Sequence, residues 1–300
     1  MIFFEDYEGI IPDFSSFQES LRTPLPTHLR INLLKTEPSD LVARLEAQEI
    51  TIQRASDAHE TLLLAPELTS PGNLVEYALG HIHPQALTSC LVSIALGPRP
   101  GSLVLDMCAA PGGKTAHMAQ IMNQTGLIVA NELYPSRQIP LAHTLARLGV
   151  LNTILTGYQA QEFPLRRRFD FILADVPCTG EGRFRLIPGK TGPRDGRGRA
   201  KLVALQRKII VRAFDLLQDG GKMIYSTCAY HPEENEDPVN FLLQNRPADM
   251  FPIHVGFTPA PGLTEWKGTR YDSRLQRAAR FYPHRLDSVG FFMAKIGRQG

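Results

Sequence analysis

Two cysteines stand where apolar runs typical of β-strands end. Cys178 follows the strand candidate 169–175 as the last residue of Asp-Val-Pro-Cys, and Cys228 follows the strand candidate 222–227 as the last residue of Ser-Thr-Cys. A thiolate is an effective nucleophile, and a second thiol can serve in proton transfer. Free cysteines more often act as small buried apolar residues. Two thiols in equivalent positions at strand ends nevertheless suggest paired chemistry.

A third motif lies upstream, where the apolar run 102–106 leads into a Gly-rich turn at residues 108–115. Glycines in such a turn let backbone amides approach a ligand without a Cβ in the way. A P-loop would require glycine at the position of Cys108, and a dinucleotide site would require Gly-x-Gly-x-x-Gly, which this turn does not supply. The motif therefore predicts a cofactor cradle of another kind.

Strand and helix patterns alternate from residue 101 onward. The strand candidates are residues 102–106, 127–131, 152–156, 169–175, 222–227 and 289–296. Helical apolar spacing occupies residues 117–122, 136–148, 201–217 and 233–243. This alternation predicts an α/β fold, a doubly wound parallel sheet covered by helices, with ligands at the carboxyl ends of its strands.

The N-terminal part has a different pattern, with helices expected at 14–21 and 38–48 and strands at 28–34 and 49–53. We expect a small α+β module over residues 1–75 and a second, larger domain over residues 76–300.

The composition of the 300-residue chain is that of a folded protein, with 43% apolar residues and a net charge of +2. Its four cysteines show no Cys-x-x-Cys spacing, which indicates neither a disulfide framework nor a metal site. The start of the sequence lacks the pattern of a signal peptide, and no uncharged stretch is long enough to cross a membrane. We therefore expect a cytoplasmic monomer that binds neither metal nor membrane.

Positive charge is concentrated in one segment. Residues 183–212 contain ten Lys or Arg and one acidic residue. A solvated loop or helix face is the ordinary explanation for such a run. Its position directly after Asp-Val-Pro-Cys favours phosphate binding instead.

The ordered set of cradle, Asp-Val-Pro-Cys and Ser-Thr-Cys resembles the Fmu/Sun (NOL/NOP/Sun) family of S-adenosylmethionine-dependent RNA cytosine-5 methyltransferases. The resemblance covers nearly the whole chain and includes residues 205–207, 232–236, 280–284 and 290–292. It implies a Rossmann-like methyltransferase sheet, S-adenosyl-L-methionine as cofactor, and tRNA or rRNA as substrate. Residues 1–75 would then be an RNA-binding module and residues 76–300 the catalytic domain.

The resemblance also implies roles for the thiols, which the motifs alone do not assign. Carbon 5 of cytosine is a poor nucleophile until a thiolate adds at carbon 6, and the carbon-5 proton must later be removed. Cys228 would be the nucleophile and Cys178 would promote release. Asp175 would hydrogen-bond the cytosine, and Lys114 would orient Asp175 or lower a thiol pKa.

In the cofactor site, Glu132 is expected to bind the ribose, and Gln159 stands where the family usually has an aspartate that contacts adenine. The expected cofactor-binding residues are Cys108, Ala109, Ala110, Pro111, Gly112, Gly113, Lys114, Glu132, Arg137, Gln159 and Asp175. The expected RNA-binding residues are Arg183, Arg185 and Arg199.

Two competing functions follow from the same motifs. Amino-group methylation would need an aromatic residue where Cys178 stands, and it would leave Cys228 idle. A catalytically silent RNA-binding or assembly factor on the same fold is the alternative from another class, and only an assay can exclude it.

Overall fold

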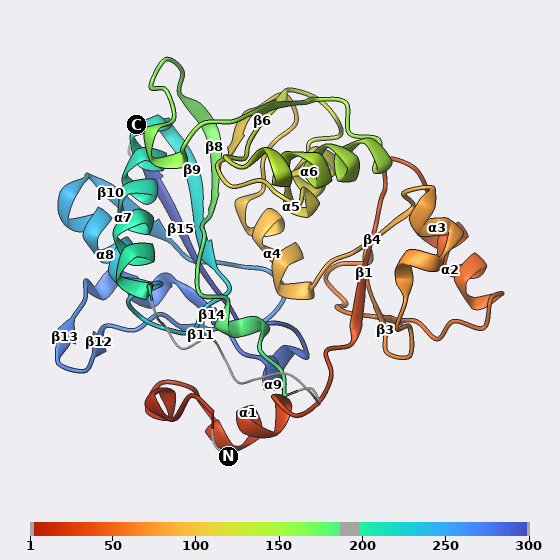
Figure 1. The fold of residues 1–300 in the computed structure, drawn as a ribbon, viewed down its shortest axis with the longest axis horizontal. Coiled ribbons are helices and arrows are strands. Elements are labelled where there is room, and N and C mark those ends of the chain that lie inside the picture. The colour runs from red at the N-terminus through yellow and green to blue at the C-terminus, as the bar shows by residue number, and fades with distance from the viewer. Residues whose placement is uncertain (1–2, 187–197, 299–300) are drawn as a thin grey trace.

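Apolar runs form the strands of a central mixed sheet in the computed structural model, which describes residues 3–186 and 198–298. The strands are β5 (Leu103–Asp106), β6 (Leu127–Asn131), β7 (Thr153–Thr156), β8 (Phe169–Asp175), β9 (Leu217–Thr227), β10 (Ala248–Phe251), β11 (Ala260–Pro261), β14 (Ala279–Phe281) and β15 (Phe291–Arg298). Their order is β11-β14-β15-β9-β8-β5-β6-β7, with β10 beside β15 (Figure 1).

The five strands from β9 to β7 are parallel, as expected, but the other strands are not. β15 runs antiparallel to β9, and β14 runs antiparallel to β15. The expectation of an all-parallel sheet was therefore wrong. A parallel crossover needs a dozen or more residues, and only residues 282–290 connect β14 to β15.

Helices cover both faces of this sheet, which confirms the doubly wound α/β class. They are α4 (Leu87–Leu96), α5 (Gly113–Ile121), α6 (Pro135–Arg147), α7 (Arg199–Leu216), α8 (Glu236–Asn245) and α9 (Pro283–Leu286). Leu105 and Ile172 share a buried cluster with residues of α7 and α8. Their neighbours Val104 and Leu173 share another with residues of α4 and α5. Strand side chains alternate between faces, so each face buries its own helix layer (Figure 1).

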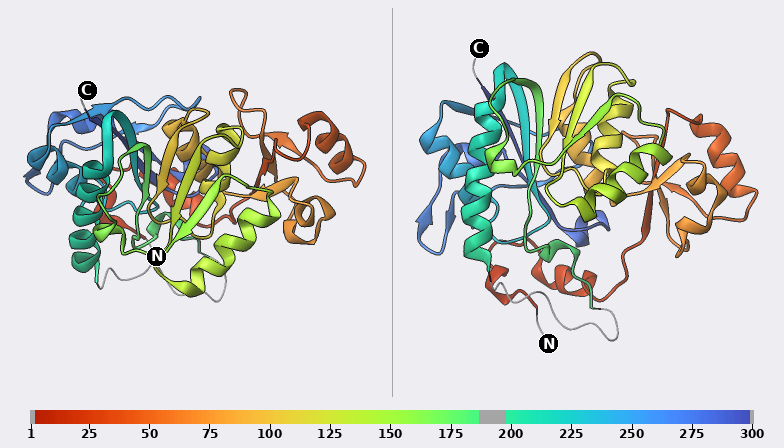
Figure 2. Two further views of the ribbon diagram at one scale, coloured as in Figure 1. Left: turned by 90° about the horizontal axis from the view of Figure 1, so that it is seen from above. Right: turned by 45° about the horizontal axis from the view of Figure 1, so that its top comes forward.

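The N-terminal part builds a separate small sheet. Its elements are β1 (Thr27–Ile31), α2 (Pro38–Glu46), β2 (Gln53–Arg54), β3 (Leu62–Ala65), α3 (Val75–Ala78) and β4 (Ile82–Pro84). The strands pair antiparallel in the order β2-β3-β1-β4. This sheet therefore extends beyond the expected boundary at residue 75. Figure 2 shows the module at one side of the molecule, away from α7.

The first residues do not belong to that module. Helix α1 (Phe14–Ser20) lies beside α9 (Figure 1). Phe17 is fully buried in one cluster with Tyr230 and Tyr282. The remaining elements are the hairpin β12 (Glu265–Trp266) with β13 (Thr269–Arg270) and the 3-10 helices η1 (Glu5–Tyr7), η2 (Pro71–Asn73), η3 (Ala160–Glu162), η4 (Glu181–Arg183) and η5 (Ser273–Arg277). The N-terminal segment thus packs against the part of the chain that carries Cys228.

The N-terminal module packs against the start of α5. A Cβ at Gly113 would come within 2.8 Å of His83 Nε2, on strand β4. The His83 ring cannot move freely, because its Nδ1 lies 2.9 Å from Arg147 NH2. Gly113 therefore faces the module, and close packing explains the need for glycine there.

We predict that Gly113→Val destabilises the protein by about 1–3 kcal/mol, the usual effect of overpacking. Thermal unfolding without any ligand measures this. Gly72→Ala is the matched control, because no atom lies within 4 Å of a Cβ built at Gly72. An unchanged melting temperature for the folded Gly113→Val protein would contradict the close packing of this junction.

Candidate active site

The carboxyl ends of β8 and β9 bring the two thiols together. Cys178 lies three residues beyond β8, and Cys228 directly follows β9. Their Sγ atoms are 3.4 Å apart, in hydrogen-bond contact. The Gly182 N–H donates to the Cys228 carbonyl at 2.8 Å, so the two loops are also joined through the backbone. The sequence-based expectation of a thiol pair matches this geometry.

The surroundings of the two thiols differ electrostatically. The hydrogen bond to Cys228 raises the pKa of Cys178, and burial raises it further. The same hydrogen bond lowers the pKa of Cys228, and the cations Lys114 and Arg183 assist, against burial and Asp175, which raise it. These opposite pKa shifts favour the proton on Cys178 and the thiolate on Cys228.

Lys114 and Asp175 form an ion pair next to the thiols. Lys114 Nζ lies 2.8 Å from Asp175 Oδ2, and the Ser226 hydroxyl donates to Asp175 Oδ1 at 2.8 Å. Burial lowers the pKa of Lys114, but its attraction to Asp175 outweighs this and the pKa is raised. Lys114 therefore stays protonated and fixes one oxygen of Asp175.

Backbone hydrogen bonds tie the cradle loop to neighbouring strands. The Met107 N–H donates to the Leu173 carbonyl and the Ala109 N–H to the Asn131 carbonyl, both at 2.9 Å. Gly112 has φ 104°, a left-handed conformation that favours glycine. Among the expected cofactor residues of this loop, exposure separates two groups. Cys108, Ala110 and Pro111 are at least partly exposed, whereas Ala109, Gly112 and Gly113 are buried.

Glu132 and Arg137 lie beside the cradle. Glu132 follows β6 and is 3% exposed. Arg137 NH1 is 3.3 Å from Glu132 Oε2, and Arg137 NH2 donates to the Ala110 carbonyl at 3.0 Å. Glu132 Oε2 is buried and accepts no hydrogen bond from the described residues. This carboxylate retains the capacity to accept a hydrogen bond from a ligand.

Gln159 stands apart from this arrangement, because its exposed side chain accepts a hydrogen bond from Gln161 at 2.7 Å. Asn131, which the sequence analysis did not single out, organises the ends of β6 and β7 instead. Its amide nitrogen donates to the Met107 and Tyr158 carbonyls, and its Oδ1 accepts from Thr156 Oγ1. Its position at the end of a strand, directly before Glu132, is the sequence signal that could have identified it.

A second unassigned residue is Asp106, at the end of β5 beneath the cradle. It is 1% exposed, and burial raises its pKa to about 7. The Thr115 hydroxyl donates to its Oδ2 at 2.7 Å. Asp106 therefore connects the end of β5 to Thr115 in the first turn of α5.

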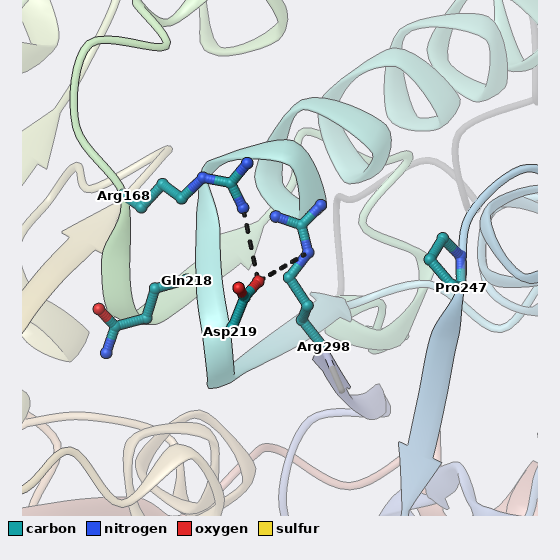
Figure 3. A pocket seen from close by; sticks show the side chains of 5 residues that line it. All are labelled: Arg168, Gln218, Asp219, Pro247 and Arg298. Atoms are coloured by element: carbon teal, nitrogen blue, oxygen red, sulfur yellow. Dashed lines mark ion pairs between the residues drawn. The ribbon is translucent and has the colours of Figure 1, made fainter. Parts of the chain in front are cut away.

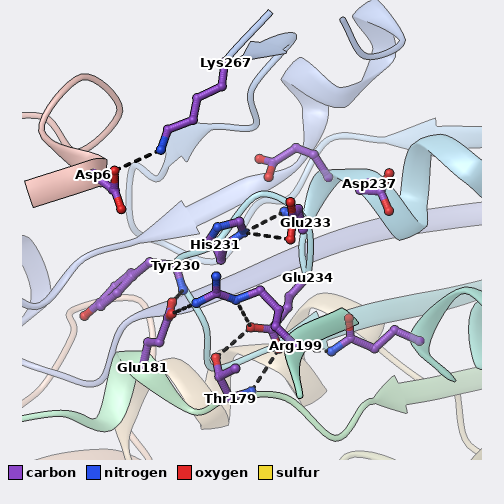
Figure 4. A network of polar contacts seen from close by, with 12 residues as sticks. Asp6, Thr179, Glu181, Arg199, Tyr230, His231, Glu233, Glu234, Asp237 and Lys267 are labelled. Atoms are coloured by element: carbon purple, nitrogen blue, oxygen red, sulfur yellow. Dashed lines mark hydrogen bonds and ion pairs between the residues drawn. The ribbon is translucent and has the colours of Figure 1, made fainter. Parts of the chain in front are cut away.

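Buried carboxylates surround the loops that carry the thiols, and Figure 4 shows their contacts. Glu236 lies in the first turn of α8, and Glu234 lies in the turn directly before that helix. Both are fully buried. Glu236 pairs with Arg280, and Glu234 accepts hydrogen bonds from Thr179. Glu181 was missed in the sequence, although it follows Cys178 by only three residues.

The three expected RNA-binding arginines lie in different environments. Arg183 is exposed. Arg185 is 5% exposed and donates to the Ser288 carbonyl at 2.9 Å, which makes it a structural residue rather than part of an RNA-contacting surface. Arg199 is paired with Glu181 at 2.9 Å. Part of the basic segment, residues 187–197, lies outside the described residues.

An open pocket lies at the opposite end of the sheet from the thiols (Figure 3). Arg168 precedes β8 and Arg298 ends β15, and both pair with Asp219, at 3.7 and 3.8 Å. Within residues 3–186 and 198–298, no group of three His, Cys, Asp or Glu side chains is placed to hold a metal ion. The described helices include none long and apolar enough to span a membrane.

Comparison with known proteins identifies relatives along nearly the whole chain. The family described as 16S rRNA methyltransferase RsmB/F matches residues 93–297. The human 28S rRNA (cytosine(4447)-C(5))-methyltransferase is 34% identical over 292 residues, which are 95% of this chain and 36% of the relative. The tRNA (cytosine(49)-C(5))-methyltransferase of Pyrococcus abyssi is 33% identical over 288 residues, 95% of this chain and 92% of the relative.

A solved structure shares the fold. A methyltransferase homologue from Pyrococcus horikoshii superposes with a TM-score of 0.83 at 34% identity, covering 96% of this chain and 91% of the other. This confirms the expected Rossmann-like architecture. The chain spans less than half the length of the human relative and nearly all of the archaeal ones.

We predict that Lys114→Gln raises the pKa of Cys228, because it removes a nearby cation and leaves Asp175 unpaired. The pH dependence of alkylation by iodoacetamide, read by peptide mass spectrometry, measures this. Cys90 and Cys108 are expected to react slowly, since burial raises the pKa of both. Lys222→Gln, in the middle of β9 and six residues before Cys228, is the control. An alkylation profile that Lys114→Gln leaves unchanged would show that Lys114 does not act on the thiol.

Proposed function

Since the chain belongs to the 16S rRNA methyltransferase RsmB/F family, we propose that it methylates carbon 5 of cytosine in RNA. The observation that carries this proposal is the contact of two unequal thiols, 3.4 Å apart, at the edge of the sheet where α/β enzymes bind their ligands. Cytosine-5 methylation requires one thiolate that adds to the ring and one group that later accepts a proton. The pair offers both.

In the proposed first step, the Cys228 thiolate adds to carbon 6 of the cytosine. The addition forms the C6–S bond and places electron density on carbon 5. Asp175, held by Lys114 and Ser226, would accept a hydrogen bond from the exocyclic amine or contact the ring nitrogen, and so stabilise the adduct. S-adenosyl-L-methionine, when bound, supplies an electrophilic methyl group.

In the proposed second step, Cys178 takes the carbon-5 proton. Once the Cys228 thiolate has added to carbon 6, it no longer accepts a hydrogen bond from Cys178. Cys178 then releases its proton to solvent. The Cys178 thiolate then accepts the proton from carbon 5, the C5–C6 double bond re-forms, and the C6–S bond breaks with its electron pair on Cys228. The thiols end as they began, and one proton is released for each methyl group transferred.

The cradle fits the cofactor. The buried Glu132 Oε2, which accepts no hydrogen bond from the described residues, suits a ribose hydroxyl donor. Arg137 pairs with Glu132 and also donates to the Ala110 carbonyl, so the partly exposed loop 108–111 lies close to Glu132. We propose that Glu132, the cradle loop and Asp175 hold the cofactor. Gln159 remains the proposed adenine contact, for which its side chain would have to leave Gln161.

RNA is the proposed substrate, because the thiols can reach carbon 6 only of a base that has left its stack. Exposed Arg183, close enough to influence Cys228, is the proposed phosphate contact, and the N-terminal module adds surface. A tRNA or an rRNA fits equally. Free catalytic thiols need a reducing compartment, which supports the proposed cytoplasmic location, and we propose a monomer.

We predict opposite outcomes for the two thiols. Cys178→Ser keeps a hydroxyl donor to the Cys228 thiolate but provides no base, so methylated RNA should remain covalently bound. Cys228→Ala should form no adduct and transfer no methyl group. With unmodified tRNA and rRNA transcripts and labelled cofactor, a denaturing gel displays the adduct.

An adduct with Cys228→Ala instead would reverse the two assignments. Methylation that persists in both variants would contradict the two-thiol mechanism. A parent protein that binds RNA but methylates none of it would identify the chain as a silent RNA-binding factor.

A further inference from the structure

A fully buried carboxylate holds the residue next to Cys178. Glu234 Oε2 accepts a hydrogen bond from the Thr179 backbone N–H at 2.9 Å, and Oε1 accepts one from the Thr179 hydroxyl at 2.6 Å. Two bonds to a single residue fix both its backbone and its side chain. The peptide that follows Cys178 therefore has one position relative to Glu234.

A second side chain fixes the residue on the other side of Cys178. Gln206, from helix α7, donates from Nε2 to the Pro177 carbonyl at 2.8 Å and to Glu234 Oε2 at 3.2 Å. Glu234 and Gln206 together thus hold the neighbours of Cys178 before and after it. Figure 4 shows Thr179 directed at Glu234.

We propose that Glu234 is a positioning residue for the release thiol, Cys178. This rests on the proposed function. Cys178 lies three residues beyond the end of β8, so the hydrogen bonds of the sheet do not hold it. The contacts of Glu234 take over this task and keep its sulfur 3.4 Å from that of Cys228. Among the described residues, Glu234 forms no hydrogen bond or ion pair with either thiol, and it acts through Thr179.

Only an ionised carboxylate suits this position. Besides Thr179 and Gln206, Arg199 Nε faces Glu234 Oε1 at 3.7 Å, so every group directed at the carboxylate is a hydrogen-bond donor. A carboxylate has two oxygens that only accept. A glutamine would turn N–H groups toward one or more of these donors and would loosen the peptide after Cys178.

A second buried carboxylate holds the far end of the same loop. Glu181 Oε1 accepts from Arg199 at 2.9 Å and from the Tyr7 hydroxyl at 3.0 Å, and Oε2 accepts from the Tyr230 N–H at 3.1 Å. Arg199 thereby joins Glu181 to Glu234. The loop is held at both ends, and Tyr7 connects it to the N-terminal segment.

The position of Cys178 matters most for one step, the removal of the carbon-5 proton. In that step the proton passes to Sγ of Cys178, the C5–C6 double bond re-forms, and the C6–S bond breaks to return its electron pair to Cys228. A displaced Cys178 slows this step. It also weakens the hydrogen bond to Cys228, but Lys114 and Arg183 still lower the pKa of Cys228, so the preceding addition is slowed less than release. The methylated adduct should therefore accumulate even though both thiols are present.

Two matched pairs of variants of the full chain test the proposal with unmodified tRNA and rRNA transcripts and labelled cofactor. Thr179→Val removes the hydroxyl bond to Glu234, and Thr179→Ser keeps it. Glu234→Gln changes the carboxylate itself. Glu236→Gln removes another fully buried charge nearby, which is bonded to Arg280 rather than to Thr179.

For Thr179→Val and Glu234→Gln we expect turnover to fall by a factor of about ten to a hundred, as for misplaced catalytic groups, with methylated adduct visible on a denaturing gel. Thr179→Ser should turn over without adduct. Glu236→Gln should lower the melting temperature without retaining adduct. Thr179→Val still decides the matter if Glu234→Gln does not fold.

Slow turnover of Thr179→Val without adduct would overturn the proposal and leave Glu234 a purely structural role. Unchanged turnover of Thr179→Val would overturn it as well. Adduct retained by Glu236→Gln would also overturn the proposal, because the loss of any buried charge would then cause adduct to accumulate. Cys178→Ser is the positive control. If it retains no adduct either, the two-thiol mechanism fails, and this result is distinct from a failure of Glu234 alone.

Discussion

The contact between Cys178 and Cys228 is the interaction on which the rest of the site depends. Burial by itself raises the pKa of a thiol, and here it acts on both cysteines. At Cys228 the hydrogen bond between the two thiols and the nearby cation Lys114 act against burial and lower the pKa. The two residues are chemically identical, so their surroundings alone make them unequal.

The fold supplies these surroundings from separate elements. Strands β8 and β9 are paired through Asp175 and Ser226, which sets both loops at one edge of the sheet. Helix α5 brings Lys114 to this edge, and the carboxylates Glu181 and Glu234 hold the loop of Cys178 from the other side. Charge thus lies on both sides of the thiols, with the cation toward Cys228 and a carboxylate toward Cys178. The architecture places the proposed nucleophile and the proposed proton acceptor in different electrostatic fields.

Much of this could be predicted from the sequence, because the central strands are continuous apolar runs. The runs 127–131 and 169–175 are strands with those bounds in the structure. Features that depend on distant residues could not be predicted. Glu234 has the pattern of a solvated acid, and its burial depends on Thr179 and Gln206. Arg185 belongs to a basic run, yet Ser288 binds it inside the protein. Apolar spacing predicted that the helix after the cradle begins at residue 117, whereas α5 begins at Gly113. The glycines of the cradle are typical of a turn, so the sequence did not indicate a helix there.

The most direct test of the account is to trap the adduct on the unmodified protein. RNA that contains 5-fluorocytidine has no proton to remove at carbon 5, so the enzyme should remain bound after methyl transfer. Digestion and mass spectrometry then identify the cysteine that carries the nucleotide. The account predicts a methylated 5-fluorocytosine on the peptide with Cys228 and an unmodified Cys178. A nucleotide on Cys178 would contradict it, as would the absence of any adduct from a preparation that methylates ordinary RNA.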